Sequence, residues 1–365
     1  MIDRRQILVA PLAPLAAQPQ AELRAAMIGV GNRGSYTMRS VMQVPGVRVA
    51  AVCDIKPDRL DKAASAAAAH SPKTYTDYRQ VLAQKDIDAV HISTPCDLHV
   101  EMAIAALQAG KHVYLEKPAG IDAESIGRLV DVAKSSRKVF LIGQQLRSHT
   151  RMRAVISKIH EGLIGKVVMI KAQRHSADDL AHDGPSADWF FDAKRSGDVI
   201  VEMSVHNLDV CNWIASSRPE RAAGFGGALV WPNDPPGRTN MDGYTLSYEY
   251  ENGVKLSYTQ VFFHARGMPG SGQYWYVYGT EGSVDLDKAM YYPRSRDKQP
   301  MEIVPPTEEK LDAQHIGAFY DCVTKGAKNP ADINVAAVGA LTAILGREAI
   351  YRKKMLSWQE LGARV

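Results

Sequence analysis

Cysteine is scarce in this chain, with four residues in 365. They are far apart and include no Cys-x-x-Cys pair, so they indicate neither a disulfide framework nor a zinc site, and we expect buried free thiols. Aromatic residues make up only 7%, and no uninterrupted apolar run reaches about 18 residues, so we expect no integral membrane segment. The net charge of +4 is small and the basic residues are scattered, which argues against a nucleic-acid partner.

Apolar and charged residues are present in the balance of a globular protein. Hydrophobic residues make up 45% and charged residues 23% of the sequence. At 365 residues the chain is longer than one hydrophobic core usually supports. We therefore expect two domains, or one large α/β domain with an appendage.

The first 21 residues resemble a twin-arginine export signal. Arg4 and Arg5 precede an apolar stretch from Ile7 to Ala17, with Ile7 at a position where Phe is commoner. A frayed cytoplasmic N-terminus is the alternative. The pattern favours a periplasmic or exported protein, and twin-arginine export carries folded, cofactor-loaded proteins.

A complete glycine fingerprint follows. An apolar strand from Arg24 leads into Gly29, Gly31 and Gly34, which have Gly-x-Gly-x-x-Gly spacing, and a helical pattern comes next. Gly29 permits a tight turn, Gly31 lets the backbone approach a pyrophosphate, and Gly34 allows close packing of helix against strand. The N-terminus of that helix would face the anion.

Asp54 ends the second apolar strand, about 20 residues beyond the glycines. A carboxylate there can accept hydrogen bonds from ribose hydroxyls and would repel a 2′-phosphate, so NAD is the expected cofactor. Lys56 and Arg59 keep NADP as the less favoured alternative. The other role open to Asp54 is the N-cap of the helix that begins near Pro57.

Strands and helices continue to alternate up to residue 143. Further strands are predicted at 88–94, 112–115 and 138–143, and helices near 61–70, 100–109 and 122–135. This alternation predicts an α/β fold whose residues 22–145 form an NAD-binding Rossmann domain with a doubly wound parallel sheet.

Polar residues follow two of these strands. Thr94, Pro95 and His99 come after the strand at 88–94, and Glu116 and Lys117 after the strand at 112–115. In open α/β sheets, ligands bind outside the carboxyl ends of the strands. These residues are therefore expected near a nicotinamide.

Residues 146–365 are expected to form an α+β domain with an open antiparallel sheet. Strands are predicted at 166–175, 244–251, 254–261 and 274–278, with a hairpin turn at Asn252-Gly253. A sheet with one solvated face is a common oligomer surface, so we expect a homodimer or homotetramer through this sheet. Residues 335–352 predict a helix of about five turns.

Glu202 and His206 are four residues apart and, on one helix, would share a face with Asp209. His206 is the candidate for proton transfer because the unperturbed pKa of histidine lies near neutrality. Such a cluster is also compatible with a metal, but no second histidine follows at zinc-site spacing, so we expect none. A capping or core histidine is the remaining alternative.

Together these motifs resemble the Gfo/Idh/MocA oxidoreductases, the family of glucose-fructose oxidoreductase and inositol dehydrogenase. The resemblance covers residues 24–352 and implies a nicotinamide cofactor and a sugar or polyol substrate. The expected cofactor contacts are Gly29, Gly31, Asn32, Arg33, Gly34, Asp54, Thr94, Pro95, His99, Glu116 and Lys117.

The resemblance also implies catalytic roles. It places Lys117 and His206 on either side of the reacting carbon, with Lys117 orienting the hydroxyl and Glu202 positioning or tuning the pair. Many relatives carry Asp where this chain has Glu202. Family precedent packs the last helix back against the first domain.

Further substrate contacts are expected from Arg147, His175, Trp189 and Asn207, beside Lys117 and His206. Trp189 belongs to a polar and aromatic loop that begins at residue 178 and suits sugar binding, although hydrophobic pinning of the loop explains it equally well. The remaining candidates are His149, Arg151 and His264.

The function favoured is NAD-dependent oxidation of a sugar, glycoside or polyol hydroxyl, with hydride passing to a nicotinamide. The alternative is an NAD-dependent glycoside hydrolase, in which transient oxidation at C3 acidifies the C2 proton, the aglycone is eliminated, water adds and the ketone is reduced again. A non-catalytic cofactor-binding regulator is a third interpretation. Export away from free NAD favours a redox-neutral cycle, either this glycosidase or a sugar-sugar oxidoreductase.

Overall fold

The computed structural model describes residues 22–177 and 187–365. The expected export signal at 1–21 and the polar loop at 178–186 lie outside the described residues. The described chain forms a parallel six-stranded sheet and a second, mostly antiparallel sheet, with helices on and between them. This arrangement confirms the α/β fold class expected from the sequence.

The first sheet has the strand order β3-β2-β1-β4-β5-β6. Its strands are β1 (Leu23–Ile28), β2 (Val47–Cys53), β3 (Lys73–Tyr75), β4 (Ala89–Ile92), β5 (His112–Leu115) and β6 (Phe140–Ile142). The central strands are short apolar runs buried on both faces, as parallel strands covered by helices are. Strand order reverses between β1 and β4, and such a switch point opens a crevice at the carboxyl ends.

The helices of this half follow the strands. They are α1 (Asn32–Val41), α2 (Pro57–Ala66), α3 (Tyr78–Leu82), α4 (His99–Gln108) and α5 (Ala123–Ser135), with 3-10 turns at Ala68–His70, Cys96–Leu98 and Gln145–Ser148. Asp77 and Asp122 cap α3 and α5 by accepting backbone N–H groups of the first turn. The sequence pattern did not reveal β3 and α3, which are short.

The second sheet has the order β14-β13-β12-β11-β7-β10-β9-β8-β15. Its strands are β7 (Val167–His175), β8 (Pro219–Gly227), β9 (Gly243–Tyr250), β10 (Lys255–Val261), β11 (Gly272–Gly279), β12 (Gly282–Asp285), β13 (Met290–Pro293), β14 (Met301–Glu302) and β15 (Leu356–Ser357). The pair β7–β10 is parallel, so the sheet is mixed. The β9–β10 hairpin turns at Asn252-Gly253, where Gly253 has a φ of 85°.

The helices of the second half are α6 (Thr150–His160), α7 (Ala187–Phe190), α8 (Ala193–Ser196), α9 (Val199–Glu202), α10 (Val205–Ala215), α11 (Leu311–Lys325) and α12 (Ile333–Tyr351). The helix expected to carry both Glu202 and His206 is interrupted, because α9 ends at Glu202 and α10 begins at Val205. All four cysteines are buried free thiols, which confirms that expectation.

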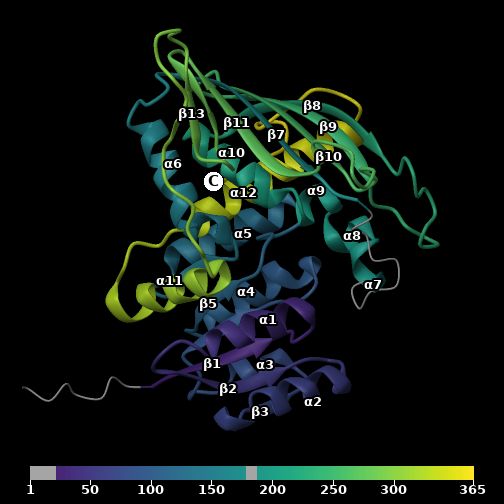
Figure 1. Ribbon diagram of the computed structural model, residues 1–365. Helices are drawn as coiled ribbons and strands as arrows, with labels where there is room; N and C mark the ends of the chain where they lie inside the picture. The colour runs from purple at the N-terminus through teal and green to yellow at the C-terminus, as the bar shows by residue number, and fades with distance from the viewer. Residues whose placement is uncertain (1–21, 178–186) are drawn as a thin grey trace, which may run out of the picture.

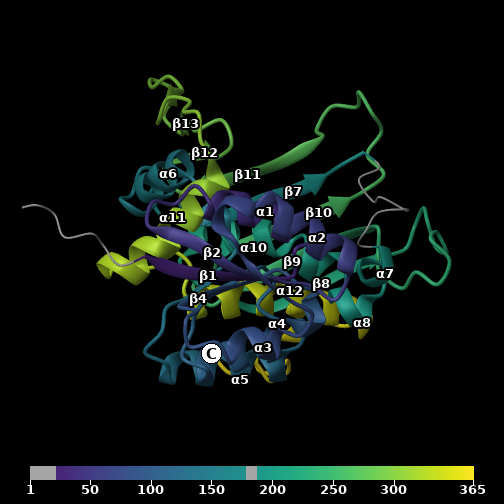
Figure 2. The ribbon, with the colours of Figure 1, turned by 90° about the horizontal axis from the view of Figure 1, so that it is seen from below.

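Helix α12 lies between the two sheets (Figures 1 and 2). It contacts α5 and β6 on one side and β8 and α10 on the other. Its length and apolar composition would also suit a membrane span, but 72% of its most apolar 18-residue window is buried inside the fold, as in a core helix. Just before it, Ala331 accepts a backbone hydrogen bond from Ile142, and Asn329 donates to Phe140 O at 2.7 Å, so this segment covers the outer edge of β6.

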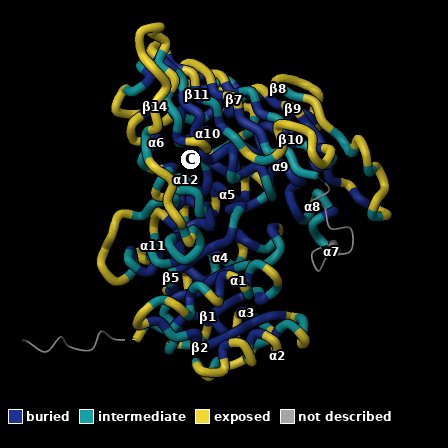
Figure 3. The backbone as a smooth tube through the Cα atoms, in the orientation of Figure 1, coloured by how far each residue is buried: buried dark blue, intermediate teal, exposed yellow. Residues whose placement is uncertain are grey.

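Buried apolar side chains form one continuous cluster through both halves. Figure 3 shows buried backbone running through both sheets and the helices between them, while exposed segments are concentrated in loops. The carboxyl ends of the first sheet therefore face elements of the second half, and the candidate site lies at this junction.

Candidate active site

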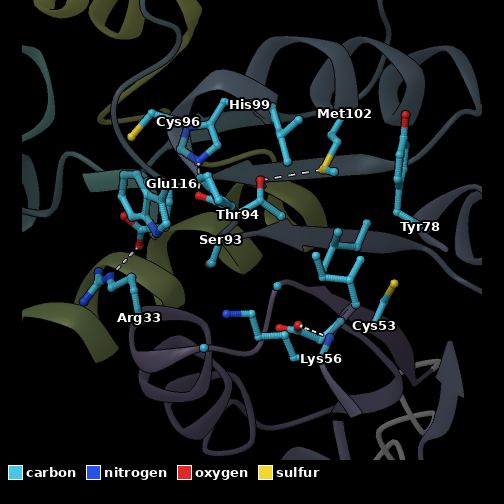
Figure 4. A pocket seen from close by; sticks show the side chains of 18 of the residues that line it. Arg33, Cys53, Lys56, Tyr78, Ser93, Thr94, Cys96, His99, Met102 and Glu116 are labelled. Atoms are coloured by element: carbon cyan, nitrogen blue, oxygen red, sulfur yellow. Dashed lines mark hydrogen bonds and ion pairs between the residues drawn. The ribbon is translucent and has the colours of Figure 1, made fainter. Parts of the chain in front are cut away.

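A cavity of about 810 Å³ lies outside the carboxyl ends of β1, β2, β4 and β5. Figure 4 shows Arg33 and Glu116 on one side of it and Cys53 and Tyr78 on the other. All expected cofactor contacts except Gly34 line the cavity, and so do Lys117, Glu202 and Trp189. The cavity lies where the strand order predicts a dinucleotide.

The glycine-rich loop fits a phosphate-binding role. Gly29 has a φ of 81°, which residues with a side chain rarely adopt. A Cβ on Gly34 would lie 1.9 Å from the Gly29 carbonyl oxygen, so only glycine lets α1 start this close to β1. The loop and the N-terminus of α1 therefore offer backbone N–H groups to an anion in the cavity.

Asp54 lines the cavity at the end of β2 and is 8% exposed. One carboxylate oxygen accepts the Val30 N–H and the other the Lys56 N–H, each at 2.9 Å. The residue at the N-cap of α2 is Lys56, so Asp54 is not the N-cap. Each carboxylate oxygen retains a second acceptor position, which a ribose hydroxyl can use.

Arg33 connects the glycine-rich loop to the rest of the site. Its Nε donates to Glu116 Oε1 at 2.7 Å, and its Nη2 pairs with Asp312 in α11. Glu116 is 3% exposed, so this ion pair compensates a buried carboxylate. Arg33 and Glu116 thus hold the first turn of α1 against the end of β5.

His99 joins the loops that follow β4 and β5. Its Nδ1 lies 2.7 Å from Pro118 O and its Nε2 lies 2.9 Å from Thr94 O. Burial lowers the pKa of His99, so the ring is neutral and donates its one N–H to one of these carbonyls. His99 thereby positions Thr94 and the Lys117-Pro118 peptide, which is cis.

Lys117 and Glu202 meet in the lining of the cavity. Lys117 Nζ donates to the Glu202 backbone oxygen at 2.8 Å and also pairs with the Glu202 carboxylate. The backbone oxygen is available because α9 ends at Glu202, and the last carbonyls of a helix have no partner within it. An ammonium has three N–H donors, so a third donor is left for a substrate oxygen.

His206 lies in the first turn of α10, and its Nδ1 is 3.1 Å from Gln144 Oε1. Because an amide oxygen only accepts, Nδ1 carries the proton in this hydrogen bond and Nε2 keeps its lone pair. Burial, followed by the charges of Lys117, Arg174 and Arg33, lowers the pKa of His206 well below its ordinary value. The imidazole is therefore neutral and its free Nε2 can accept a proton, but the lowered pKa makes it a weaker base than the near-neutral histidine expected from the sequence.

The other expected substrate contacts are placed differently. Arg147 forms a bidentate pair with Asp209, with both distances 2.8 Å, and this pair removes Asp209 from the group expected around His206. His175 alternates with Arg174 along β7 and bonds Thr259 on the sheet face opposite His206. Asn207 is fully buried and donates to Gln273 Oε1 at 3.0 Å.

The remaining candidates make contacts elsewhere. His149 lies 3.2 Å from a Glu309 carboxylate oxygen, Arg151 donates to backbone oxygens of residues 287, 288 and 304, and His264 contacts Met268 O. Within residues 22–177 and 187–365, no three His, Cys, Asp or Glu side chains form a group that could hold a metal ion.

Gln144, Asp312 and Arg174 were not identified from the sequence. Gln144 follows β6 in the way Thr94 follows β4, so its position at a strand end was the available signal. Asp312 reaches Arg33 across 279 positions of sequence, which no spacing argument reveals.

Two family models match the chain. Residues 23–144 match an oxidoreductase family with an NAD-binding Rossmann fold, and residues 152–285 match the Gfo/Idh/MocA C-terminal domain. The chain belongs to the Gfo/Idh/MocA family. This membership confirms the resemblance carried by the glycine fingerprint, the Glu116-Lys117-Pro118 segment and the segment around His206, and it assigns the first half as an NAD-binding Rossmann domain.

Relatives of this Gfo/Idh/MocA protein fall into different classes of enzyme. A glycosyl hydrolase family 109 protein of Saccharopolyspora erythraea is 33% identical over 42% of this chain and 35% of its own length. An inositol 2-dehydrogenase of Salmonella typhimurium is 29% identical over 53% of this chain and 54% of its own length. The chain thus matches only about a third to a half of the length of these curated relatives.

Solved structures support the fold over nearly the whole chain. A scyllo-inositol dehydrogenase from Lactobacillus casei has a TM-score of 0.77, with 19% identity, and the match covers 94% of this chain and 100% of that one. At this identity the likeness establishes the architecture.

Proposed function

We propose that this Gfo/Idh/MocA protein is an NAD-dependent oxidoreductase that oxidises a hydroxyl-bearing carbon of a sugar, glycoside or polyol. The observation that carries the proposal is the meeting of Lys117 and Glu202 in the lining of a cavity that is also lined by the glycine-rich loop and Asp54. The inositol dehydrogenase relative supports this substrate class.

Each side chain at the site has a separate role in the proposed reaction. When bound, the dinucleotide supplies the hydride acceptor. Lys117 donates its third N–H to the substrate oxygen, and Glu202 holds the ammonium in place. His206 Nε2 takes the hydroxyl proton, so the O–H bond breaks as an N–H bond forms. Gln144 holds the imidazole in the tautomer that this transfer requires.

The proposal is tested with Lys117→Ala and His206→Ala. Each variant should bind NAD within about threefold of the wild type but turn over about 10² times more slowly or worse, the scale of positioned acid-base groups. Turnover is measured by NADH absorbance across a panel of sugars and polyols, and folding by circular dichroism. A folded variant of either kind with near-native turnover would remove that residue from the mechanism.

We also propose a redox-neutral alternative at the same site, supported by the glycosyl hydrolase family 109 relative. The Arg4-Arg5 pattern supports export, and an enzyme outside the cytoplasm must regenerate its cofactor within each cycle. The test incubates the enzyme as purified, without added NAD, with aryl glycosides and free sugars in deuterated water.

The products separate the candidate reactions. Aglycone release with deuterium at C2 supports the glycosidase, and paired formation of a lactone and a polyol supports a sugar-sugar oxidoreductase. If activity instead requires stoichiometric NAD and accumulates NADH, the protein is a net dehydrogenase and the redox-neutral proposal is wrong. Fusion of residues 1–21 to a reporter tests export separately.

We further propose a homo-oligomer that pairs through the outer face of the second sheet. That face carries exposed apolar side chains, with Phe225 on β8 81% and Met169 on β7 42% exposed, and the ring stack of Tyr274 on Tyr276 lies on β11, which is next to β7. Sedimentation should show a dimer or tetramer. Phe225→Asp together with Met169→Asp should shift the equilibrium between oligomer and monomer toward the monomer.

A further inference from the structure

Arg174 lies near the end of β7 on the sheet face that packs against the helices. Side chains alternate along a strand, and Arg174 shares its face with Ile170 and Ala172, which are buried. Its register partners are Gln260 in β10 and Gln273 in β11. A guanidinium is thus flanked by two side-chain amides on the inner face of the sheet.

Two hydrogen bonds connect this part of the sheet to the start of α10. Asn207 donates to Gln273 Oε1 at 3.0 Å, and Trp275 Nε1 donates to Asn207 O at 3.1 Å. Asn207 directly follows His206, so the neighbours of Arg174 contact the turn of helix that carries the proposed base. Arg174 is also close enough for its charge to lower the pKa of His206, after burial and Lys117.

The charges around His206 are balanced except at Arg174. Lys117 is paired with Glu202, Arg33 with Glu116 and Asp312, and Arg147 with Asp209. Arg174, by contrast, forms no hydrogen bond or ion pair through its side chain with any residue in 22–177 or 187–365. A partly buried guanidinium without a counter-charge is costly, and the cost is offset when a ligand supplies the anion.

Two further polar atoms lack partners among the described residues, one on a register partner of Arg174 and one on the residue that bonds its other register partner, Gln273. They are Gln260 Nε2 and Asn207 Oδ1, which belong to fully buried side chains. Buried polar atoms without partners mark places where a missing ligand or water completes the hydrogen bonding. The surroundings of Arg174 therefore provide one positive charge together with amide donors and acceptors.

We propose that Arg174 binds a carboxylate on the substrate, so that the preferred substrates are acidic sugars such as uronates or their glycosides. This inference rests on the proposed function and specifies its substrate class. A planar guanidinium matches a carboxylate in two-pronged geometry. A single unpaired cation balances the single charge of a carboxylate, whereas a phosphate dianion would need more.

The test measures binding to the NADH-loaded enzyme, in which no hydride can leave the sugar. Calorimetry compares glucuronate with glucose, galacturonate with galactose and mannuronate with mannose. At least one acid should bind about 10- to 100-fold more tightly than its neutral counterpart. Arg174→Met should abolish that preference, and Arg174→Lys should restore part of it.

Lys171→Met is the matched control, because Lys171 lies on the same strand but is exposed on the opposite face, and its removal should leave the preference unchanged. If no acid binds more tightly than its neutral counterpart, or if Arg174→Met keeps the preference, the inference is wrong. Tighter binding of glucose 6-phosphate than of glucuronate would also overturn it.

Failure of the carboxylate inference is distinguishable from failure of the proposed function. If the acids bind through Arg174 but none is oxidised when NAD replaces NADH, the carboxylate site stands and the oxidoreductase proposal is wrong. If neutral sugars are oxidised as fast as acids and bind as tightly, the oxidoreductase proposal stands and the carboxylate site is wrong.

Discussion

One carboxylate oxygen of Asp54 accepts a hydrogen bond from the glycine-rich loop, and the other accepts one from the start of α2. We expect Asp54→Asn to bind NAD about tenfold more weakly, because a neutral amide is a poorer acceptor for the ribose hydroxyls than a carboxylate. The same change removes the charge that repels a 2′-phosphate, so the preference for NAD over NADP should narrow. Fluorescence titration of each cofactor measures both effects.

The melting temperature of Asp54→Asn serves as the control for the two backbone hydrogen bonds that Asp54 also accepts. If the wild type binds NADP as tightly as NAD, the assignment of Asp54 as the discriminating residue fails, and Lys56 and Arg59 become the residues to vary.

Gln144 is a positioning residue, because it acts on substrate only through His206. We expect Gln144→Glu to raise the pKa of His206, since a carboxylate beside the ring favours the imidazolium. The acid limb of the kcat/KM profile should then move to higher pH. Gln144→Leu removes the acceptor without adding charge, so it should lower kcat at every pH without that shift. Identical profiles for the two variants would contradict the assignment.

At the level of single residues, the sequence predicts those side chains that follow strands. Asp54 and Lys117 are at strand ends in a recognisable alternation of strands and helices, and the structure places both at the cavity. The partners of these side chains are harder to predict. Gln144 contacts His206 across 62 positions of sequence, and a contact between segments so far apart has no local signature.

The break between α9 and α10 matters at the level of elements. Spacing alone suggested that Glu202 and His206 lie on one helix, but the four-residue α9 ends at Glu202 and frees its carbonyl for Lys117. The two side chains therefore come from separate helices. Periodicity could not show this, because the interruption at Met203 and Ser204 leaves the hydrophobic pattern intact.

The packing of α1 on β1 gives a prediction for a whole element. We expect Gly34→Ala to displace the start of α1, because the added Cβ would meet the Gly29 carbonyl oxygen. Overpacking of this kind costs about 1–3 kcal/mol, so the melting temperature should fall by several degrees and NAD affinity should drop at least tenfold. Differential scanning fluorimetry with and without NAD measures both.

Gly317→Ala is the matched control for this change. Gly317 lies within α11, and a Cβ there has no heavy atom within 4 Å, so alanine should be neutral or slightly stabilising. Equal effects of the two substitutions would show that the approach of α1 to β1 is not the constraint.

At the level of the whole molecule, the sequence predicted two sheets and the final helix, but not the parallel pair β7–β10. The paired residues of these two parallel strands are 86 positions apart, and pairing over such distances is decided by packing rather than by local pattern. The strands of the hairpin β9–β10 are adjacent in sequence, and they were predicted within two residues.

Acid stability is a property of the whole fold, to which buried histidines contribute. Burial lowers the pKa of His91 to about 3, whereas in the unfolded chain it titrates near its ordinary value. Below about pH 6.5 the unfolded state therefore binds a proton that the folded state does not. The free energy of unfolding consequently decreases as the pH is lowered. We expect His91 to account for roughly 1–2 kcal/mol of the decrease in the free energy of unfolding between pH 7 and pH 5.

His91→Phe tests this contribution, because phenylalanine keeps the ring that packs on Tyr114 and cannot titrate. The variant should be less stable than the wild type at pH 7, because it lacks the hydrogen bond to Tyr320. Its free energy of unfolding should, however, decrease less between pH 7 and pH 5. Urea unfolding at the two pH values gives the comparison. An unchanged pH dependence would mean that other groups dominate acid unfolding.

The position of α12 and of the segment before it has a consequence for biosynthesis. The edge of β6 is covered by residues 329–331, and one side of the first half is covered by α12, which ends at Tyr351. A ribosome therefore finishes the glycine fingerprint long before it makes the residues that close this half. We expect the nascent Rossmann half to remain open, and unable to retain a dinucleotide, until almost the whole chain has been released.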